Sequence, residues 1–595
     1  MLSEGQSMIP GKLRNKLSYR SNLALSLALT GSLAAACSGN LETQGQQTAV
    51  GTVEPGFGAG SLSNPSGPTN QGTPGVPSVP SPGATVVNVD NCNSASPPLS
   101  AQLRRLSETQ VRNSIVDIFG DIFPDELWPQ FEDGARLLGM NTLADTLQVN
   151  SINLERHYDA VRGIVQTLLR SHGEFQACAQ DQQSACVDAM IESYGRRIWR
   201  RPLTLDERNR FSNAHQTYDD NESKLEFAFN VLLVGSDFLF RSETGGIAAQ
   251  AGGERSLDNY EVASFLSYAV WNSTPDDALL DLASQDAGLG AEQLTQTLDR
   301  MLADPRANTA LVELYKDYLK LDLVLKREKD EVLGFTSAAR DDLLRSVELT
   351  LGSRIGSDVP LMSVFGGSTY FMNNATASFF NEQVAQSEFS PVDTNANERD
   401  GVLNHPAFLS VHSTRSSSGI VQRGVFTLEQ LLCQHLPDPP DDISTAEPPP
   451  GLDPERTSER ELLTITHSSK PECLGCHQFI DPAGFGFEHF DAAGRYRTTE
   501  KQDVAIDATG ELAGVGSYTT SAEFSRALVA SERMKACVTQ RFLEHYMGQE
   551  LESNSCALQR YRALLANEED SVYGLLRALV QLPSFLSRNQ SEVNQ

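Results

Sequence analysis

The stretch LDNYEVASFLSYAVW, residues 257–271, places Asp258 and Glu261 three residues apart and then repeats apolar side chains at helical spacing. This pattern predicts an amphipathic helix that starts at Asp258. The following stretch QLTQTLDRMLADPRANTALVELYKDYLKL, residues 293–321, continues the same periodicity as two further amphipathic helices.

The same helical signals recur on both sides of this region. Ser107–Gln110 and Thr204–Glu207 have the sequence of a capping box, and Gly120 is a stop signal. Residues 338–355 and 521–548 are again of helical period, whereas convincing β-alternation is scarce. The sequence therefore predicts a mainly α protein.

The N-terminus has the pattern of an export signal. Four basic residues between positions 12 and 20 precede the apolar stretch NLALSLALTGSLAAAC, which ends at Cys37. Its last residues resemble a lipobox, which predicts lipidation of Cys37 and a membrane anchor; an ordinary signal peptidase site is the alternative. By resemblance to Gram-negative lipoproteins, Ser38 favours the outer membrane, so we expect an exported lipoprotein facing the periplasm or cell surface.

Residues 38–99 consist largely of Gly, Pro, Ser, Thr and Gln. Such a segment buries too little apolar surface to offset its ordering entropy, so we predict a flexible tether. The net charge of −30 argues against nucleic-acid binding, which needs a basic footprint. It suits a solvated acidic surface or a cationic partner such as a basic redox protein.

Nine cysteines are present. Setting Cys37 aside for the lipid and Cys473 with Cys476 for the motif below leaves six, which in an exported protein predict up to three disulfides. Proximity in sequence favours the pairs Cys178–Cys186 and Cys537–Cys556. Elimination then pairs Cys92 with Cys433, although other connectivities stay open.

The stretch PECLGCHQFIDPAGFGFEHFDAAGRYR, residues 471–497, contains a C-x-x-C-H motif. In haem c, two cysteines bind the porphyrin through thioethers and the adjacent histidine ligates the iron. We therefore predict Cys473 and Cys476 as attachment points and His477 as proximal ligand. A zinc site, a redox dithiol and a plain disulfide are alternatives; zinc would need further ligands, and no second C-x-x-C or H-x-x-x-H lies nearby.

The neighbouring residues fit a haem site. A ligating imidazole usually donates its other N–H to a carboxylate or carbonyl, so we expect a bond from His477 to Asp481 or to the Pro482 carbonyl. Arg495 and Arg497 are candidate partners of the haem propionates, with exposed arginines as the alternative. Three aromatic residues either wall the porphyrin or pack in the core: Phe485, Phe487 and Phe490.

A second polar stretch, HSTRSSSGIVQRG, spans residues 412–424. It lacks the G-x-S-x-G elbow of a hydrolase. Arg415 and Arg423 with their hydroxyl neighbours suit an anion or carbohydrate contact, or a loop over the haem. A structured polar loop is the alternative.

Several motifs follow one another in a characteristic order: RRLSETQVRNSIVDIFG (104–120), RRIWRRPLTLDERNRF (196–211), LDNYEVASFLSYAVWNSTPDDALLDLA (257–283), HSTRSSSGIVQRGVFTLEQLLCQHLPDPP (412–440), the C-x-x-C-H stretch and MKACVTQRFLEHYMGQEL (534–551). Over residues 100–585 the chain resembles the secreted multi-module proteins of planctomycete-type, cytochrome-associated domains of unknown function. The resemblance implies a c-type haem at the C-x-x-C-H motif. No second such motif occurs in this chain.

The resemblance also bears on the sixth iron ligand. Members of the family tend to carry a histidine at the position of His467, six residues before the motif. Met534 and Met547 lie at distances similar to that of the ligand methionine in small mono-haem cytochromes. An open or water-bound iron is the further alternative.

These observations predict several small helical modules in series, with a cytochrome c-like haem segment near the C-terminus. The expected parts are a lipoprotein signal peptide (1–37), a tether (38–99), helical modules (100–173, 174–250 and 251–395), a Ser/Arg loop and Pro-rich module (396–452), a haem c segment (453–505) and a C-terminal helical module (506–595).

The expected function is that of an exported, lipid-anchored, mono-haem electron-transfer protein with an unidentified redox partner. A haem peroxidase-like or oxygen-activating enzyme is one alternative. A disulfide-stapled surface scaffold without haem is another, so the sequence leaves enzymatic activity undecided.

Overall fold

The computed structural model describes residues 102–131, 147, 150–245, 254–285, 288–357, 359–437, 450–468 and 471–589. All of them belong to one compact unit, residues 92–595. The predicted signal peptide, the lipidated Cys37, the tether and Cys92 lie outside the described residues.

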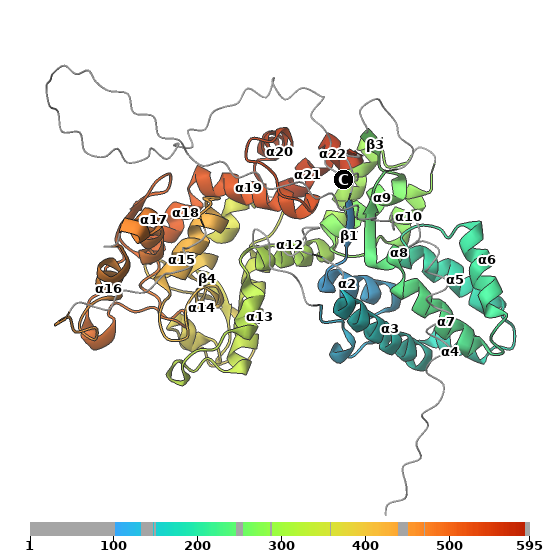
Figure 1. Ribbon diagram of the computed structural model, residues 1–595, viewed down its shortest axis with the longest axis horizontal. Helices are drawn as coiled ribbons and strands as arrows, with labels where there is room; N and C mark the ends of the chain where they lie inside the picture. The colour runs from blue at the N-terminus through green and yellow to red at the C-terminus, as the bar shows by residue number, and fades with distance from the viewer. Residues whose placement is uncertain are drawn as a thin grey trace, which may run out of the picture. The chain divides into compact units, whose positions relative to one another are not determined.

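The predicted mainly α class is confirmed (Figure 1). The first group of helices follows a short strand and packs around its own hydrophobic core: α2 (Glu108–Phe119), α3 (Ser151–Ser171), α4 (Gly173–Gln180), α5 (Ala185–Ile198), α6 (Leu205–His215), α7 (Asn221–Val234) and α8 (Ser236–Leu239).

A second, larger hydrophobic core extends from Leu257 to Phe585, so the modules after residue 251 share one interior. Its helices are α9 (Asn259–Val270), α10 (Asp277–Ala283), α11 (Ala291–Leu302), α12 (Pro305–Tyr318), α13 (Ser337–Ser353), α14 (Pro406–Val411), α15 (Ile420–Phe426), α16 (Glu459–Leu463), α17 (Pro471–Phe485), α18 (Ser521–Val529), α19 (Glu532–Met547), α20 (Cys556–Asn567), α21 (Gly574–Val580) and α22 (Pro583–Leu586).

Short turns of 3-10 and π type complete the helical structure: the 3-10 turns η2 (Asp125–Leu127), η3 (Leu321–Lys326), η4 (Glu331–Leu333), η5 (Leu361–Phe365), η6 (Ala377–Phe380), η7 (Val402–Asn404) and η10 (Lys501–Asp503), and the π turns η8 (Thr427–Leu431) and η9 (Thr464–Ser468). The described strands form antiparallel pairs only: β1 (Gln102–Arg105) with β2 (Phe240–Glu243), β3 (Glu254–Ser256) with β8 (Ser587–Asn589), β4 (Thr369–Met372) with β5 (Ser390–Asp393), and β6 (Gly510–Leu512) with β7 (Gly516–Tyr518).

The two predicted capping boxes form at Ser107 and Thr204, and a third forms at Asp258, the predicted start of another helix. The side chains of Ser107, Thr204 and Asp258 each accept a hydrogen bond from the backbone three residues ahead, and the residue there bonds back. These reciprocal bonds satisfy N–H groups that have no partner inside the helix. The local sequence therefore decides where α2, α6 and α9 begin.

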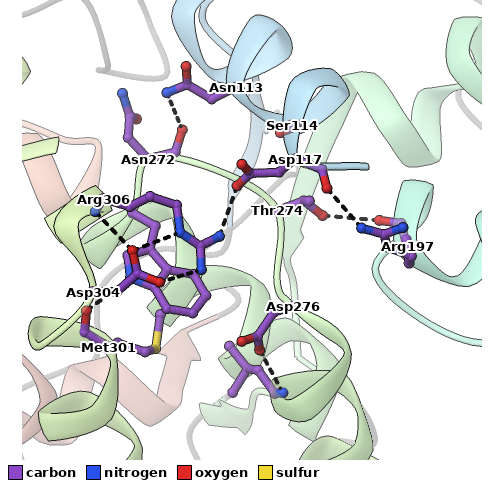
Figure 2. Close-up of polar contacts among 12 residues, drawn as sticks. Asn113, Ser114, Asp117, Arg197, Asn272, Thr274, Asp276, Met301, Asp304 and Arg306 are labelled. Carbon is purple, nitrogen blue, oxygen red and sulfur yellow. Dashed lines mark hydrogen bonds and ion pairs between the residues drawn. The ribbon is translucent and has the colours of Figure 1, made fainter. Parts of the chain in front are cut away.

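A polar joint connects α2 of the first group of helices with the loop after α9 and with the start of α12 (Figure 2). Arg306 at the start of α12 pairs with Asp117 of α2 at 3.0 Å and with Asp304 at 2.8 Å. Its guanidinium lies 3.6 Å from the centre of the Trp271 ring. The two carboxylates neutralise the charge of Arg306, and together with the aromatic ring they fix the position of its guanidinium.

A buried carboxylate ties the ends of the described chain together. Glu243 of β2 binds Arg588 of β8 at 2.6 Å and Arg241 at 3.0 Å, and Arg104 of β1 lies 3.5 Å away. All four side chains are almost fully buried. The three guanidinium groups lower the pKa of Glu243 to about 2, although burial alone would raise it.

Two disulfides are resolved between described cysteines. The Cys178–Cys186 pair is confirmed. The pairing of Cys537 with Cys556 is wrong, as is that of Cys92 with Cys433, because Cys433 bonds Cys537. Ten residues of α19 follow Cys537 and carry the chain about 15 Å away along the helix, whereas η8 packs across α19 and brings Cys433 to it.

Cys556 is also disulfide-bonded. None of the described helices is both long and apolar enough to cross a bilayer.

The two resolved disulfides predict different losses of stability. Replacing Cys433 and Cys537 by Ala opens a loop of 104 residues and is expected to cost about 4.7 kcal/mol by loop-closure entropy. Replacing Cys178 and Cys186 opens a separation of 8 residues and should cost roughly 2.5 kcal/mol. Urea unfolding of both double variants tests the order; equal losses would contradict it.

Candidate functional site

The C-x-x-C-H motif lies in the N-terminal half of α17. Cys473 and Cys476 are one helical turn apart on this helix, and His477 follows directly. Both cysteines are partly buried free thiols. Leu474, between them in the sequence, is a large apolar side chain that is 46% exposed. The structure thus brings two thiols and an imidazole together on one helix end.

A buried carboxylate orients the His477 ring. Nδ1 of His477 lies 2.7 Å from Oδ1 of Asp481, one turn later on α17. Asp481 is 5% exposed, and its other oxygen accepts the Ser468 hydroxyl at 2.5 Å. The bond predicted from His477 is present, and its acceptor is the carboxylate. With Nδ1 engaged by Asp481, Nε2 is the other nitrogen of the ring.

The Pro482 carbonyl has a different role. It accepts the hydroxyl of Tyr518 on β7 at 2.5 Å. Pro482 lies inside α17 and has no N–H to donate along the helix, and the Tyr518 bond ties this turn of α17 to β7. Burial raises the pKa of Tyr518 above its ordinary value, which keeps the phenol protonated as the donor.

The helices α15 and α17 lie side by side and touch backbone to backbone (Figure 1). A Cβ at Gly424 of α15 would lie 2.2 Å from the Ile480 carbonyl oxygen, and one at Gly484 of α17 would lie 2.1 Å from that of Ile420. No larger residue fits at either position without movement of the backbone. The two glycines therefore set the separation of the motif helix from the rest of the core.

Arg423 anchors the loop that follows α17. Its fully buried guanidinium donates to the carbonyls of Phe487 (3.0 Å), Phe490 (2.9 Å), Asp491 (2.8 Å) and Leu409 (3.2 Å). Burial lowers its pKa to about 10, and the group stays charged at neutral pH. The alternative of a structured polar loop is thus correct for Arg423.

Glu488 is a fully buried carboxyl between the polar stretch and Arg497. The Ser418 hydroxyl donates to its Oε1 at 2.6 Å, and Arg497 Nη2 lies 3.7 Å from Oε2. Burial raises the pKa of Glu488 to about 7 despite the neighbouring arginine. No sequence signal marks Glu488, because its raised pKa results from burial in the folded protein.

Several residues of the predicted haem environment have partners within the protein. Phe487 and Phe490 are completely buried members of the second core. This is the alternative in which these aromatic rings pack in the core. Arg495 stacks on Phe379 at 5.0 Å and donates to the Leu333 carbonyl at 2.5 Å, while Arg497 faces Glu488. Phe485 lies under Arg460, whose guanidinium is 4.3 Å from the ring centre.

The candidates for the sixth ligand are not brought together with the motif by any described contact. Met534 and Met547 of α19 are buried in the second core. His467 belongs to η9, and its side chain lies outside the described residues. Among the described residues there is also no group of three His, Cys, Asp or Glu side chains arranged to hold a metal ion.

Comparison with known proteins gives three matches in series. Residues 104–170 match PSD3, a protein of unknown function (DUF1587); residues 257–381 match PSD4, a protein of unknown function (DUF1592); and residues 399–500 match PSCyt3, a protein of unknown function (DUF1588). The last match includes both the polar stretch and the C-x-x-C-H motif. No curated protein and no solved structure matches the chain.

The order of the three matches supports a multi-module protein of the planctomycete-type, cytochrome-associated class. It hints at a cytochrome-like role and supplies no substrate.

The crossing of α15 and α17 predicts opposite effects for two glycines of the same helix. Gly484→Ala is expected to destabilise the protein by about 1–3 kcal/mol, because the new Cβ overlaps the Ile420 carbonyl. Gly475→Ala is the matched control, since nothing lies within 4 Å of its Cβ, and it should stabilise by about 0.5–1 kcal/mol. Urea unfolding of the haem-free protein measures both; equal effects would contradict the close crossing.

Glu488 predicts a pH-dependent stability. Between its ordinary pKa of 4.5 and the raised value of about 7, the unfolded chain has released this proton and the folded protein retains it. The free energy of unfolding therefore loses the Glu488 contribution as pH rises through this window. Relative to the natural protein, Glu488→Gln should become progressively more stable from pH 4.5 to 7; the exposed Glu550→Gln is the control for charge removal.

Proposed function

We propose that this protein is a mono-haem c-type electron-transfer protein in which α17 carries the haem. Cys473 and Cys476 would form the two thioether bonds, and His477 would ligate the iron through Nε2. The observation that carries the proposal is the 2.7 Å contact of His477 Nδ1 with the buried carboxylate of Asp481, directly after two unbridged thiols. An oriented histidine backed by a carboxylate is the usual outer-shell arrangement of metal-ligating imidazoles.

The residues present fit the group in three respects. The two thiols are free, as thioether formation requires. Leu474, between them in the sequence, is an exposed apolar side chain that a porphyrin could cover. Ser468 and Asp481 hold the imidazole ring against rotation. When bound, the haem supplies an iron that exchanges one electron between its ferrous and ferric states.

The role of Asp481 is to position His477 and increase its basicity. A hydrogen bond from Nδ1 to a carboxylate places more electron density on the ring than a bond to a neutral acceptor. A more basic ligand favours the ferric state, so this chain would hold its haem at a lower reduction potential than the same site with a neutral partner.

The proposal extends to the compartment. Haem c attachment takes place after export, which agrees with the export signal expected at residues 1–37. We propose a lipid anchor at Cys37 and a position at the outer membrane, where the net charge of −30 favours a basic redox partner.

The test is expression of the full chain in a bacterial host that exports it and attaches haem c. Intact mass after removal of non-covalent haem and the absorption spectrum of the pyridine complex report attachment. The natural chain should carry one covalent haem, Cys473→Ser or Cys476→Ser should retain one thioether and shift the band to longer wavelength, and the double variant should carry none.

The spectrum of the intact protein then separates the functions. Sharp low-spin bands on reduction support electron transfer with two protein ligands. A high-spin spectrum with peroxide or oxygen reactivity would replace electron transfer by haem catalysis. Absence of covalent haem from the natural chain, with a co-expressed cytochrome c matured normally, would overturn both and favour a scaffold.

Asp481→Asn tests the positioning role. The amide keeps the size of the side chain and removes its charge, so we expect the reduction potential to rise while the haem content is retained. Ser468→Ala, which removes only the support of Asp481, should shift the potential in the same direction by less. An unchanged potential in Asp481→Asn would contradict the assignment of Nδ1.

A further inference from the structure

A cavity of about 830 Å³ lies between residues 320–329 and residues 411–430. None of Cys473, Cys476 and His477 lines it. Val421, Gln422 and Val425 of α15 face this cavity, whereas Ile420 and Gly424 of the same helix contact α17. The cavity is therefore separate from the candidate haem site, on another face of α15.

The charge of the cavity is opposite to that of the chain. Five basic side chains and two carboxylates line it, in a protein of net charge −30: Lys320, Lys326, Arg327, Lys329 and Arg415 against Glu328 and Glu429. A concave surface of one sign concentrates ligands of the opposite sign. The lining therefore selects anions.

Two of the basic residues are available to a ligand. Lys326 and Arg327 are exposed, and neither side chain forms a hydrogen bond or an ion pair with any residue that the structure describes. Arg415 is 64% exposed and already pairs with Asp330 at 3.1 Å. Lys326 and Arg327 are thus the principal contacts for an anionic group.

Buried contacts hold the two walls of the cavity in place. Lys329 is 7% exposed and donates to the Ser413 hydroxyl and the Thr414 carbonyl, both at 2.6 Å. The Asp330 N–H donates to the Arg415 carbonyl at 3.2 Å. Because burial lowers the pKa of Lys329 to about 7, its ammonium is only partly protonated at neutral pH. The main role of Lys329 is therefore to link the two walls by hydrogen bonds. The walls are therefore fixed before any ligand binds.

Part of the cavity lining is apolar and is called the apolar wall below. It consists of Leu323, Val411, Val421, Val425 and Phe426. The ring of His412 packs on Phe426 at 3.9 Å between centres, and burial lowers the pKa of His412 to about 3, so the imidazole is uncharged. A lining with both apolar and basic side chains suits a molecule with both an apolar body and an acidic group.

We propose that this cavity binds an organic anion, in which a carboxylate, phosphate or sulfate contacts Lys326 and Arg327 and an apolar body packs against Val421 and Val425. The site does not require haem, so its occupancy is independent of the function proposed for α17.

The test uses the full chain and three probes in isothermal titration: naphthalene-2-carboxylate, the neutral naphthalene-2-carboxamide, and acetate. The proposal expects the first to bind, with an affinity that falls as salt is added, and the other two to bind at least about tenfold more weakly. 2-Naphthyl phosphate and 2-naphthyl sulfate then show which acidic group is preferred.

Variants locate the binding. Lys326→Gln with Arg327→Gln should weaken naphthalene-2-carboxylate binding about tenfold or more. The matched control is Arg208→Gln with Arg210→Gln. It removes the same charge from exposed positions on α6, in the first group of helices, and should leave binding unchanged. Cys473→Ser with Cys476→Ser should also bind as the natural chain does.

Three outcomes would overturn the proposal. Equal binding of the carboxamide would remove the role of charge, and equal binding of acetate would remove the role of the apolar wall. An unchanged affinity in the Lys326 and Arg327 double variant, with the far-ultraviolet circular dichroism of the natural protein, would place the binding elsewhere.

Discussion

The contact of two backbones at Gly424 and Gly484 is the constraint on which the candidate haem segment depends. With α15 and α17 in direct contact, the carbonyls after α17 come within reach of Arg423, and its guanidinium binds three of them together with the Leu409 carbonyl of α14. Charge-assisted bonds to carbonyls in a dry interior are strong, and a lost partner would leave a buried charge unsatisfied. The motif helix and the loop behind it are therefore fixed by residues far away in sequence.

Buried arginines bound to main-chain carbonyls recur through the fold. Arg399 reaches the carbonyls of Phe379, Asn404 and Gly494, and Arg200 reaches those of Asp237, Phe238 and Phe240. Each planar guanidinium satisfies several carbonyls in short turns, helix ends and loops. In this way the long irregular connections of a helical protein acquire fixed positions. The residues that hold α17 and the loop after it come from 399–430 and 510–524, so the candidate haem segment depends on distant parts of the chain for its support.

Much of the local structure could be predicted because the interacting atoms are neighbours in the chain. The capping residues Ser107, Thr204 and Asp258 each bond a residue three positions later. The two residues of the sequence pattern are therefore the two partners of the hydrogen bond. The same holds for Cys178–Cys186 and for the His477–Asp481 contact, which spans one helical turn. The wrong pairing of Cys537 with Cys556 shows the limit: nearness in sequence fails when a rigid helix carries the chain away.

By itself, the sequence determined the helical class, the starts of its helices, the C-x-x-C-H motif and the carboxylate behind its histidine, because each depends on side chains within about one helical turn. Only the tertiary structure decided the Cys433–Cys537 bond, the burial of Phe487 and Phe490 in the core, the raised pKa of Glu488 and the basic cavity beside α15. These features arise where segments up to about a hundred residues apart pack together. Solvent exclusion and electrostatic fields are set by that packing, which no local pattern encodes.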